Sequence, residues 1–191
     1  MIFASRPQLC RLLYASLLLL PLGCAPGRNL PELPSRADGG YRLGPGDTVR
    51  LITYGEEPLT GEFRVNDQGV VALPLAGTIR AAGKTPRELE DAIAVALKKR
   101  DMLRKASVSV EVATYRPIYV LGEVNKPGQY PYQPGMNVVT AAAMAGGFTY
   151  RAIEGYASVL RTVGGDSVEG KASRQAAVQP GDVITVFERR F

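Results

Sequence analysis

The sequence has no histidine and no tryptophan, and only two cysteines among its 191 residues. Without histidine it lacks the usual general base near neutral pH and the commonest metal ligand. Serine and threonine then have no histidine to activate them, and the Gly-rich pieces AGG and VGGD lack the lysine and spacing of a phosphate loop. We therefore expect no enzyme, no catalytic residues, no metal and no cofactor. The net charge of +5 is mild, and we expect no nucleic-acid partner.

The chain also has no run of about 20 apolar residues, the length that a membrane-spanning helix needs. An uncharged apolar run of 11 residues, Leu12–Leu22, follows a positive start at Arg6 and Arg11, as in a secretory signal peptide over residues 1–23. The run ends in LPLGC, which resembles a bacterial lipobox. We predict cleavage before Cys24 and lipidation of its sulfur, the alternative being an ordinary signal peptide with an incidental cysteine.

Two further details of the signal region concern the mature chain. Cys10 leaves with the signal, so Cys24 has no partner for an intrachain disulfide. Ala25 follows the cysteine where lipoproteins retained at the inner membrane tend to have aspartate, which suggests the outer membrane. Residues 24–40 contain APGRNLPELPSRADGG, without apolar periodicity, and we expect them to form the lipidated N-terminus and a flexible tether.

Glycine (21) and proline (14) are abundant, so corners are frequent and the elements between them must be short. A first domain is expected over residues 41–114. DTVRLITY and ASVSVEVAT alternate as half-buried strands, and GEFRV and VVALPL predict a hairpin around NDQG. TPRELEDAIAVALKKR predicts a helix, in which Thr85 and Glu88 form a capping box and Pro86 takes the first helical position.

A second domain is expected over residues 115–191. PIYVLGEV, YASVLRTV and DVITVF predict strands, and NKPGQYPY turns the first of these back on itself. NVVTAAAMAGG predicts a short helix, capped by Asn137 and ended by Gly146 and Gly147. Each domain holds several short strands and one helix, which indicates the α+β class.

Pro-Gly corners recur along the chain, in GPGD, KPGQ, QPGM and QPGD. Proline fixes φ near −65° and glycine tolerates positive φ, which suits a type II turn, and aspartate can accept a backbone N–H of the turn. We expect these residues to be turn-formers, and the two aspartates not to be catalytic acids. The structural residues predicted are Pro45, Gly46, Asp47, Pro127, Gly128, Pro134, Gly135, Pro180, Gly181 and Asp182.

The stretch YRLGPGDTVRLITYGEEPLTGEFRVNDQGVVALPLAGTIRAAGKTPRELEDAI resembles the polysaccharide export domain of bacterial outer-membrane exporters. IYVLGEVNKPGQYPYQPGMNVVTAAAMAGGF resembles the SLBB domain, a β-grasp module that binds soluble ligands. The two domains, in this order and behind a lipobox, together make the resemblance to these exporters specific. The resemblance implies a small export domain of short strands and one helix, followed by a β-grasp domain.

The same resemblance implies a function without chemistry. Copies of the chain would close into a homo-oligomeric ring in the periplasm, held to the outer membrane by lipid. Exopolysaccharide would pass through the ring, and an inner-membrane polysaccharide copolymerase would dock below it. The chain resembles the short exopolysaccharide branch of the family, because it ends in DVITVFERRF where larger exporters add an amphipathic membrane-spanning helix.

Two rival functions fit the same sequence. The chain could be a monomeric periplasmic module whose β-grasp domain binds a sugar or another small ligand. It could also be an accessory protein of another envelope secretion complex. Clustered tyrosines would suit sugar stacking, but tyrosine is also a favoured strand residue, and we expect them to serve packing or subunit contacts. The clustered tyrosines are Tyr115, Tyr119, Tyr130, Tyr132, Tyr150 and Tyr156.

Overall fold

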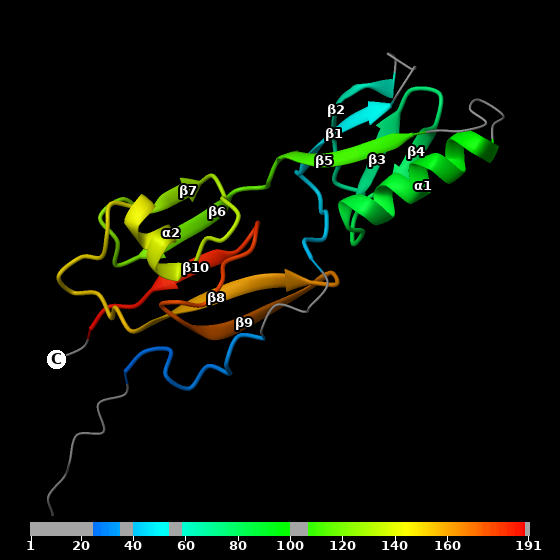
Figure 1. The fold of residues 1–191 in the computed structure, drawn as a ribbon. Coiled ribbons are helices and arrows are strands. Elements are labelled where there is room, and N and C mark those ends of the chain that lie inside the picture. The colour runs from blue at the N-terminus through cyan, green and yellow to red at the C-terminus, as the bar shows by residue number, and fades with distance from the viewer. Residues whose placement is uncertain (1–24, 35–39, 54–58, 100–106, 190–191) are drawn as a thin grey trace, which may run out of the picture.

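The computed structural model of the chain describes residues 25–34, 40–53, 59–99 and 107–189 (Figure 1). These residues form ten strands and two helices, arranged as two units that follow one another along an elongated molecule. Each unit has its own hydrophobic core, and the α+β class is confirmed. The predicted signal peptide and Cys24 lie outside the described residues.

The first unit combines a three-stranded sheet, a two-stranded hairpin and one helix. The sheet has the antiparallel order β2-β1-β5, and β3 pairs with β4. Strands alternate buried and exposed positions, as sequences with one solvated face do. The elements are β1 (Thr48–Thr53), β2 (Gly61–Arg64), β3 (Val70–Leu73), β4 (Gly77–Arg80), α1 (Pro86–Lys99) and β5 (Val108–Thr114).

Helix α1 begins and packs as its sequence predicts. The N–H of Glu88 donates to Thr85 Oγ1, and the N–H of Thr85 donates to Glu88 Oε2, so the capping box is formed. Leu89, Ile93 and Leu97 are buried at successive four-residue spacings, which places one apolar face against the sheet.

The predicted hairpin between GEFRV and VVALPL is wrong. The turn at NDQG does form, with the N–H of Gly69 donating to the Asn66 carbonyl at 2.9 Å. The two arms nevertheless separate: β2 pairs with β1, and β3 pairs with β4. The Gly69 carbonyl accepts the N–H groups of Ala81 and Ala82, which draws the chain after the turn towards β4. A second tight turn at residues 74–77 then closes the β3-β4 hairpin.

The second unit is a five-stranded sheet in the order β7-β6-β10-β8-β9. The central pair, β6 and β10, is parallel, and the other neighbours are antiparallel, as in the β-grasp fold. The sequence prediction missed β9, which β8 reaches through the turn of VGGD. The elements are β6 (Ile118–Gly122), β7 (Gly128–Tyr130), α2 (Val138–Met144), β8 (Tyr156–Val163), β9 (Asp166–Ser173) and β10 (Val183–Val186).

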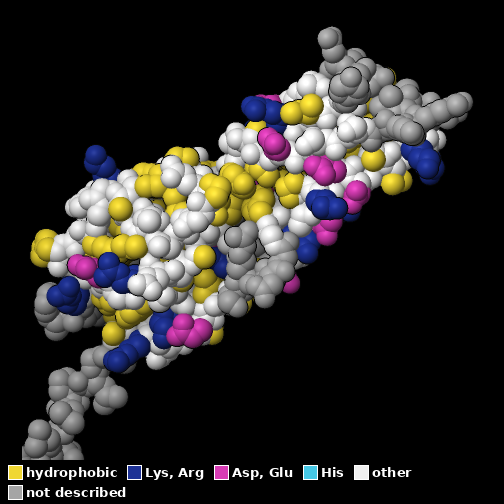
Figure 2. Space-filling model, viewed as in Figure 1, with side chains coloured by type: hydrophobic (Ala, Val, Ile, Leu, Met, Phe, Trp, Pro, Cys, Tyr) yellow, Lys and Arg dark blue, Asp and Glu magenta, His cyan; other side chains and the backbone are white. Residues whose placement is uncertain are grey.

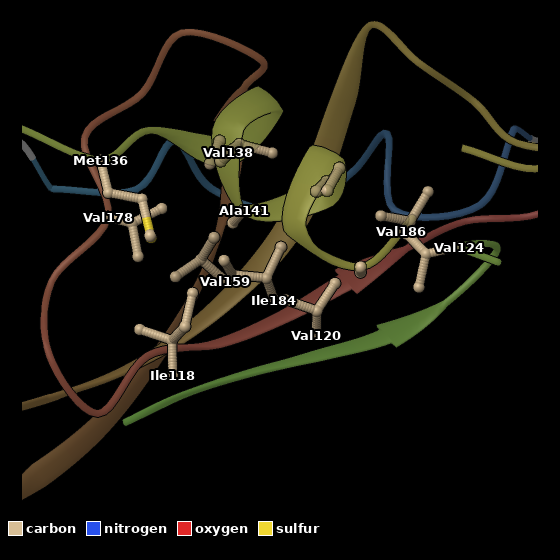
Figure 3. Close-up of a cluster of buried hydrophobic side chains, with 14 of the residues drawn as sticks. Ile118, Val120, Val124, Met136, Val138, Ala141, Val159, Val178, Ile184 and Val186 are labelled. Carbon is tan, nitrogen blue, oxygen red and sulfur yellow. The ribbon is translucent and has the colours of Figure 1, made fainter. Parts of the chain in front are cut away.

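Helix α2 covers one face of this sheet. Asn137 caps it through its side chain and exchanges hydrogen bonds with Thr140, and Gly146 and Gly147 follow its end with φ of 82° and 86°. Figure 3 shows the side chains of this core converging between the helix and the strands. The labelled core residues are Ile118, Val120, Val124, Met136, Val138, Ala141, Val159, Val178, Ile184 and Val186.

The expectation of a flexible tether does not describe residues 25–34. This segment runs beside β9, where Glu32 forms a parallel bridge with Lys171 and Leu33 packs against the second core (Figure 1). The physical reason is that β9 is an edge strand, with backbone groups free to pair with any extended neighbour. The chain therefore contacts the second unit before it enters the first.

Candidate functional site at the junction of the two units

The two Pro-Gly-Asp corners have the same local geometry. Gly46 and Gly181 have φ of 96° and 87°, the left-handed conformation that the third position of a type II turn requires. The N–H groups of Asp47 and Asp182 each donate to the carbonyl three residues earlier, at 3.2 and 3.1 Å. Each carboxylate accepts the N–H of that same earlier residue, at 2.8 and 2.7 Å. Both aspartates are thereby used to close a turn and to start a strand, β1 or β10, at a fixed angle.

Asp47 is fully buried and is satisfied by uncharged donors. Its Oδ1 accepts the backbone N–H of Arg116 at 2.9 Å, and its Oδ2 accepts the Tyr41 hydroxyl as well as the turn N–H. Burial, together with the hydrogen bond to Asp47, raises the pKa of the Tyr41 hydroxyl far above its usual value. The hydroxyl is therefore a protonated donor at any physiological pH.

Asp182 is equally buried, but it is neutralised by a guanidinium. Arg161 Nε donates to Oδ1 at 3.0 Å and Arg161 Nη2 donates to Oδ2 at 2.7 Å, a bidentate pair whose side chains are 6% and 1% exposed. Nη2 also donates to the Ala177 carbonyl. The pair ties the final corner to β8 inside the second unit.

Arg116 connects the corners of the two units. Its backbone N–H donates to Asp47 in the first unit, and its Nε donates to the Pro180 carbonyl in the second at 3.0 Å. A Cβ added at Gly44 would lie 1.8 Å from Arg116 Nη1, and one at Gly181 would lie 3.2 Å from Nε. Glycine in both corners therefore lets the arginine side chain lie directly against them.

An aromatic chain lies at the same junction. Tyr115 contacts Tyr41 with ring centroids 5.0 Å apart and Tyr132 with centroids 5.3 Å apart, both edge-on. Tyr132 packs on the second core and Tyr41 on the first, so the three rings link the two units. Figure 2 shows hydrophobic side chains gathered over the middle of the molecule on this face. The junction is thus held by aromatic contacts as well as by Arg116.

The remaining predicted corners lie elsewhere. Pro134 and Gly135 form a third turn of this type, with φ of 84° at the glycine and the next N–H bonded to the Gln133 carbonyl. The corner at Pro127 and Gly128 differs from the prediction, because Gly128 lacks a positive φ and begins β7. Pairing with β6 keeps that glycine extended.

The sequence did not indicate Tyr41, Arg116 or Arg161 as partners of the corners. The hydrogen bonds of Arg116 and Arg161 span 69 and 21 residues, and partners so distant in the chain leave no local pattern. The bond from Tyr41 to Asp47 spans only 6 residues. One signal was available for Arg161. It occupies an inward position of an alternating strand, where a charged side chain needs a buried partner.

The described part of the chain shows neither a metal-binding cluster nor a membrane-spanning helix. No three acidic, cysteine or histidine side chains there gather closely enough to hold a metal ion. None of the helices in those residues is long and apolar enough to cross a bilayer. The side chains at the junction contact backbone groups and neighbouring side chains, and these contacts position the two units.

Comparison with known families places two domains on the two units. Residues 35–113 match the family described as polysaccharide biosynthesis/export protein, and residues 117–172 match the SLBB domain. The gap between the two matches contains Tyr115 and Arg116, the residues that join the units at the junction.

The curated relatives are named for the production, export or transport of polysaccharides. The chain is 37% identical over 145 residues to the exopolysaccharide production protein ExoF of Rhizobium meliloti, covering 70% of this chain and 33% of ExoF. It is 35% identical over 105 residues to the EPS I polysaccharide export outer membrane protein EpsA of Ralstonia nicotianae, covering 53% of this chain and 27% of EpsA. The polysialic acid transport protein KpsD of Escherichia coli is 27% identical over 109 residues, covering 56% of this chain and 19% of KpsD. The chain thus matches a third or less of the length of each of these relatives.

Proposed function

Because the chain belongs to the polysaccharide biosynthesis/export protein family and has an SLBB domain, we propose that it is a lipid-anchored exporter of exopolysaccharide at the outer membrane. Copies of the chain close into a ring in the periplasm, and the polymer passes through the ring. An inner-membrane polysaccharide copolymerase delivers the polymer from below. The protein makes and breaks no covalent bond, and Cys24 supplies the anchor.

The observation that supports this proposal most strongly is the pairing of the two domains in one chain. A polysaccharide biosynthesis/export domain followed by an SLBB domain spans residues 35–172, with a short gap between the two. The relative named for exopolysaccharide production matches over 145 residues, which is more than either unit contains. Single-domain matches would favour a ligand-binding module equally well.

The junction gives the proposal a physical basis. A closed ring requires every copy to present its contact surfaces at the same angle, because a varying angle would give open chains of different curvature. Arg116 and the three tyrosine rings fix that angle by contacting both units. We propose that this is why the two corners are built around a shared arginine.

Lipid anchoring suits a chain of this kind. One acyl chain binds a membrane only marginally, whereas two or more give stable attachment. A diacylated or triacylated Cys24 would therefore hold the protein at the membrane without a spanning helix. How the polymer crosses the membrane itself is a separate step.

Deletion of the gene and mass measurement test the function. Loss of secreted exopolysaccharide, restored by the wild-type chain, supports the export function. Normal secretion after deletion would instead indicate an accessory protein of another secretion complex. The detergent-solubilised protein should have a mass many times the 20.5 kDa of the chain. A monomer that binds sugar tightly would indicate the rival ligand-binding module.

An arginine variant tests the role of the junction. Arg116→Ala removes the hydrogen bond to the Pro180 carbonyl, and bonds to charged groups contribute about 1.5–3 kcal/mol. We expect both units to stay folded by circular dichroism and the ring fraction to fall about tenfold or more. Arg50→Ala, which removes an exposed arginine from β1, is the matched control and should assemble normally. Normal assembly of the Arg116 variant would refute the positioning role.

A further inference from the structure

The N-terminal segment contacts the second unit at two places, near Pro26 and Gly27 and at residues 31–33. The N–H of Leu33 donates to the Lys171 carbonyl at 2.8 Å, and the N–H of Lys171 donates to the Pro31 carbonyl at 2.7 Å. Lys171 Nζ also pairs with Glu32 at 2.7 Å. A Cβ at Gly170 would lie 2.7 Å from the Leu33 Cα, so β9 accepts the segment closely because glycine stands there. Residues 31–33 are therefore held against β9.

The start of this segment is held at one end of the second unit. The Tyr156 hydroxyl donates to the Pro26 carbonyl at 2.9 Å. A Cβ on Gly27 would come within 2.2 Å of the Phe187 ring, so only glycine lets the chain lie on that ring. In the sequence, Cys24 immediately precedes Ala25, the first described residue of this segment. An acyl anchor on Cys24 would therefore be attached one residue before this end of the second unit.

A loop and the end of the described chain complete the same surface. The Phe187 carbonyl accepts the N–H of Ile153 at 2.9 Å, and the Arg151 carbonyl accepts the N–H of Arg189 at 2.7 Å. Arg151 also forms an ion pair with Glu188. We name the surface made by residues 25–28, 149–154 and 187–189 the anchor end.

Tyr150 projects from the anchor end. Its side chain is 88% exposed, more than any other large hydrophobic residue in the described part of the chain. The neighbouring Arg151 is paired with Glu188, and the anchor end as a whole carries three cations, Arg28, Arg151 and Arg189, against two carboxylates, Glu154 and Glu188. Tyrosine of this kind, with an apolar ring and a polar tip, is enriched where proteins meet the headgroup region of a membrane.

We propose that the anchor end lies on the phospholipid surface, with the Tyr150 ring inserted among the headgroups. The inference rests on the proposed lipidation of Cys24. An acyl anchor next to Ala25 keeps Tyr150 at high effective concentration beside the bilayer, so a weak contact is enough to orient the molecule. The first unit, at the other end of the molecule in Figure 1, then points away from the membrane.

The absence of tryptophan permits a direct test. Tyr150→Trp introduces the only tryptophan in the chain, and Val95→Trp introduces one on α1 of the first unit, where Val95 is 67% exposed. Each lipidated variant is placed on phosphatidylethanolamine–phosphatidylglycerol vesicles with and without brominated acyl chains. We expect brominated lipid to quench the Tyr150→Trp variant several times more than the Val95→Trp variant, with a blue shift only in the former.

Equal quenching of the two variants, or stronger quenching at Val95→Trp, would overturn the proposal. So would burial of the Tyr150→Trp side chain without lipid quenching, which would indicate contact with a second copy. A second arm couples Cys24, the remaining cysteine once Cys10 is removed, to a maleimide headgroup lipid, so that the result does not depend on natural acylation. Exopolysaccharide secretion after gene deletion is measured separately. Lipid quenching of the Tyr150→Trp variant together with normal secretion after deletion would refute the proposed function alone. Loss of secretion after deletion, without lipid quenching of the variant, would refute this inference alone.

Discussion

The buried ion pair in the second unit gives the sharpest stability prediction. Arg161→Met removes the guanidinium but keeps a flexible side chain of similar length in the same space. The Asp182 carboxylate, 1% exposed, then keeps only its turn N–H and loses both bonds to the guanidinium. A carboxylate left buried without its cation is among the costliest defects in a protein.

The expected cost follows from that burial. Removing one member of a buried, hydrogen-bonded ion pair costs about 3–5 kcal/mol. Whole domains are stable by about 5–15 kcal/mol, so the loss is a large fraction of the total. At about 4–8 °C for each kcal/mol in a small domain, the Tm of the second unit should fall by about 12 °C or more.

Thermal and urea unfolding, followed by circular dichroism, measure this change. Arg50→Met is the matched control, because Arg50 and Glu62 form an ion pair whose side chains are 54% and 50% exposed. Exposed ion pairs contribute about 0–1 kcal/mol to stability. The urea concentration at the unfolding midpoint of the control should therefore differ from that of the wild type by only about a few tenths of a molar. An Arg161→Met variant no less stable than Arg50→Met would refute the reasoning that this pair holds the final corner.

Two further predictions concern backbone conformation and pH. Gly122→Ala should destabilise the second unit severely, because φ at Gly122 is 81° and an added Cβ would lie 2.0 Å from the Val186 carbonyl oxygen. Gly135 has a similar φ of 84° but open space around it, so Gly135→Ala should cost only about 1–2 kcal/mol. Urea unfolding measures both. The backbone hydrogen bond from Thr85 holds the pKa of Glu88 below its usual value of 4.5, so its contribution to helix stability is present above that pH and is lost as pH falls through the folded-state pKa. NMR titration of the Glu88 carboxyl checks the direction, and a pKa at or above 4.5 would contradict it.

Local patterns in the sequence predicted most of the elements of the fold. Helix α1 followed from a capping box and from leucines and isoleucine at four-residue spacing, and both signals depend only on near neighbours. The start of α2 at Asn137 and its end before Gly146 and Gly147 were likewise predicted from neighbouring residues alone. Such signals are reliable because one residue satisfies the backbone groups of the next turn.

Strand pairing was predicted less well. The NDQG turn was correctly identified, yet its two arms joined different sheets, because pairing is decided by partners elsewhere in the chain. The docking of residues 25–34 was missed for a related reason: proline and glycine indicate a loop but do not say what the loop rests on. Arg116 was also invisible, since its role depends on two corners 64 and 69 residues away.

The position of residues 25–34 beside β9 has a topological consequence. Part of the second unit precedes the first unit in the chain, and the rest follows it. The first unit is therefore an insertion in the second unit, its host, and the chain passes between the two units twice. β10, which lies between β6 and β8, comes last in chain order among the described strands. On the ribosome the inserted unit can fold early, whereas its host must wait for β10. A gene fragment beginning at residue 41 would yield a host whose β9 edge is uncovered.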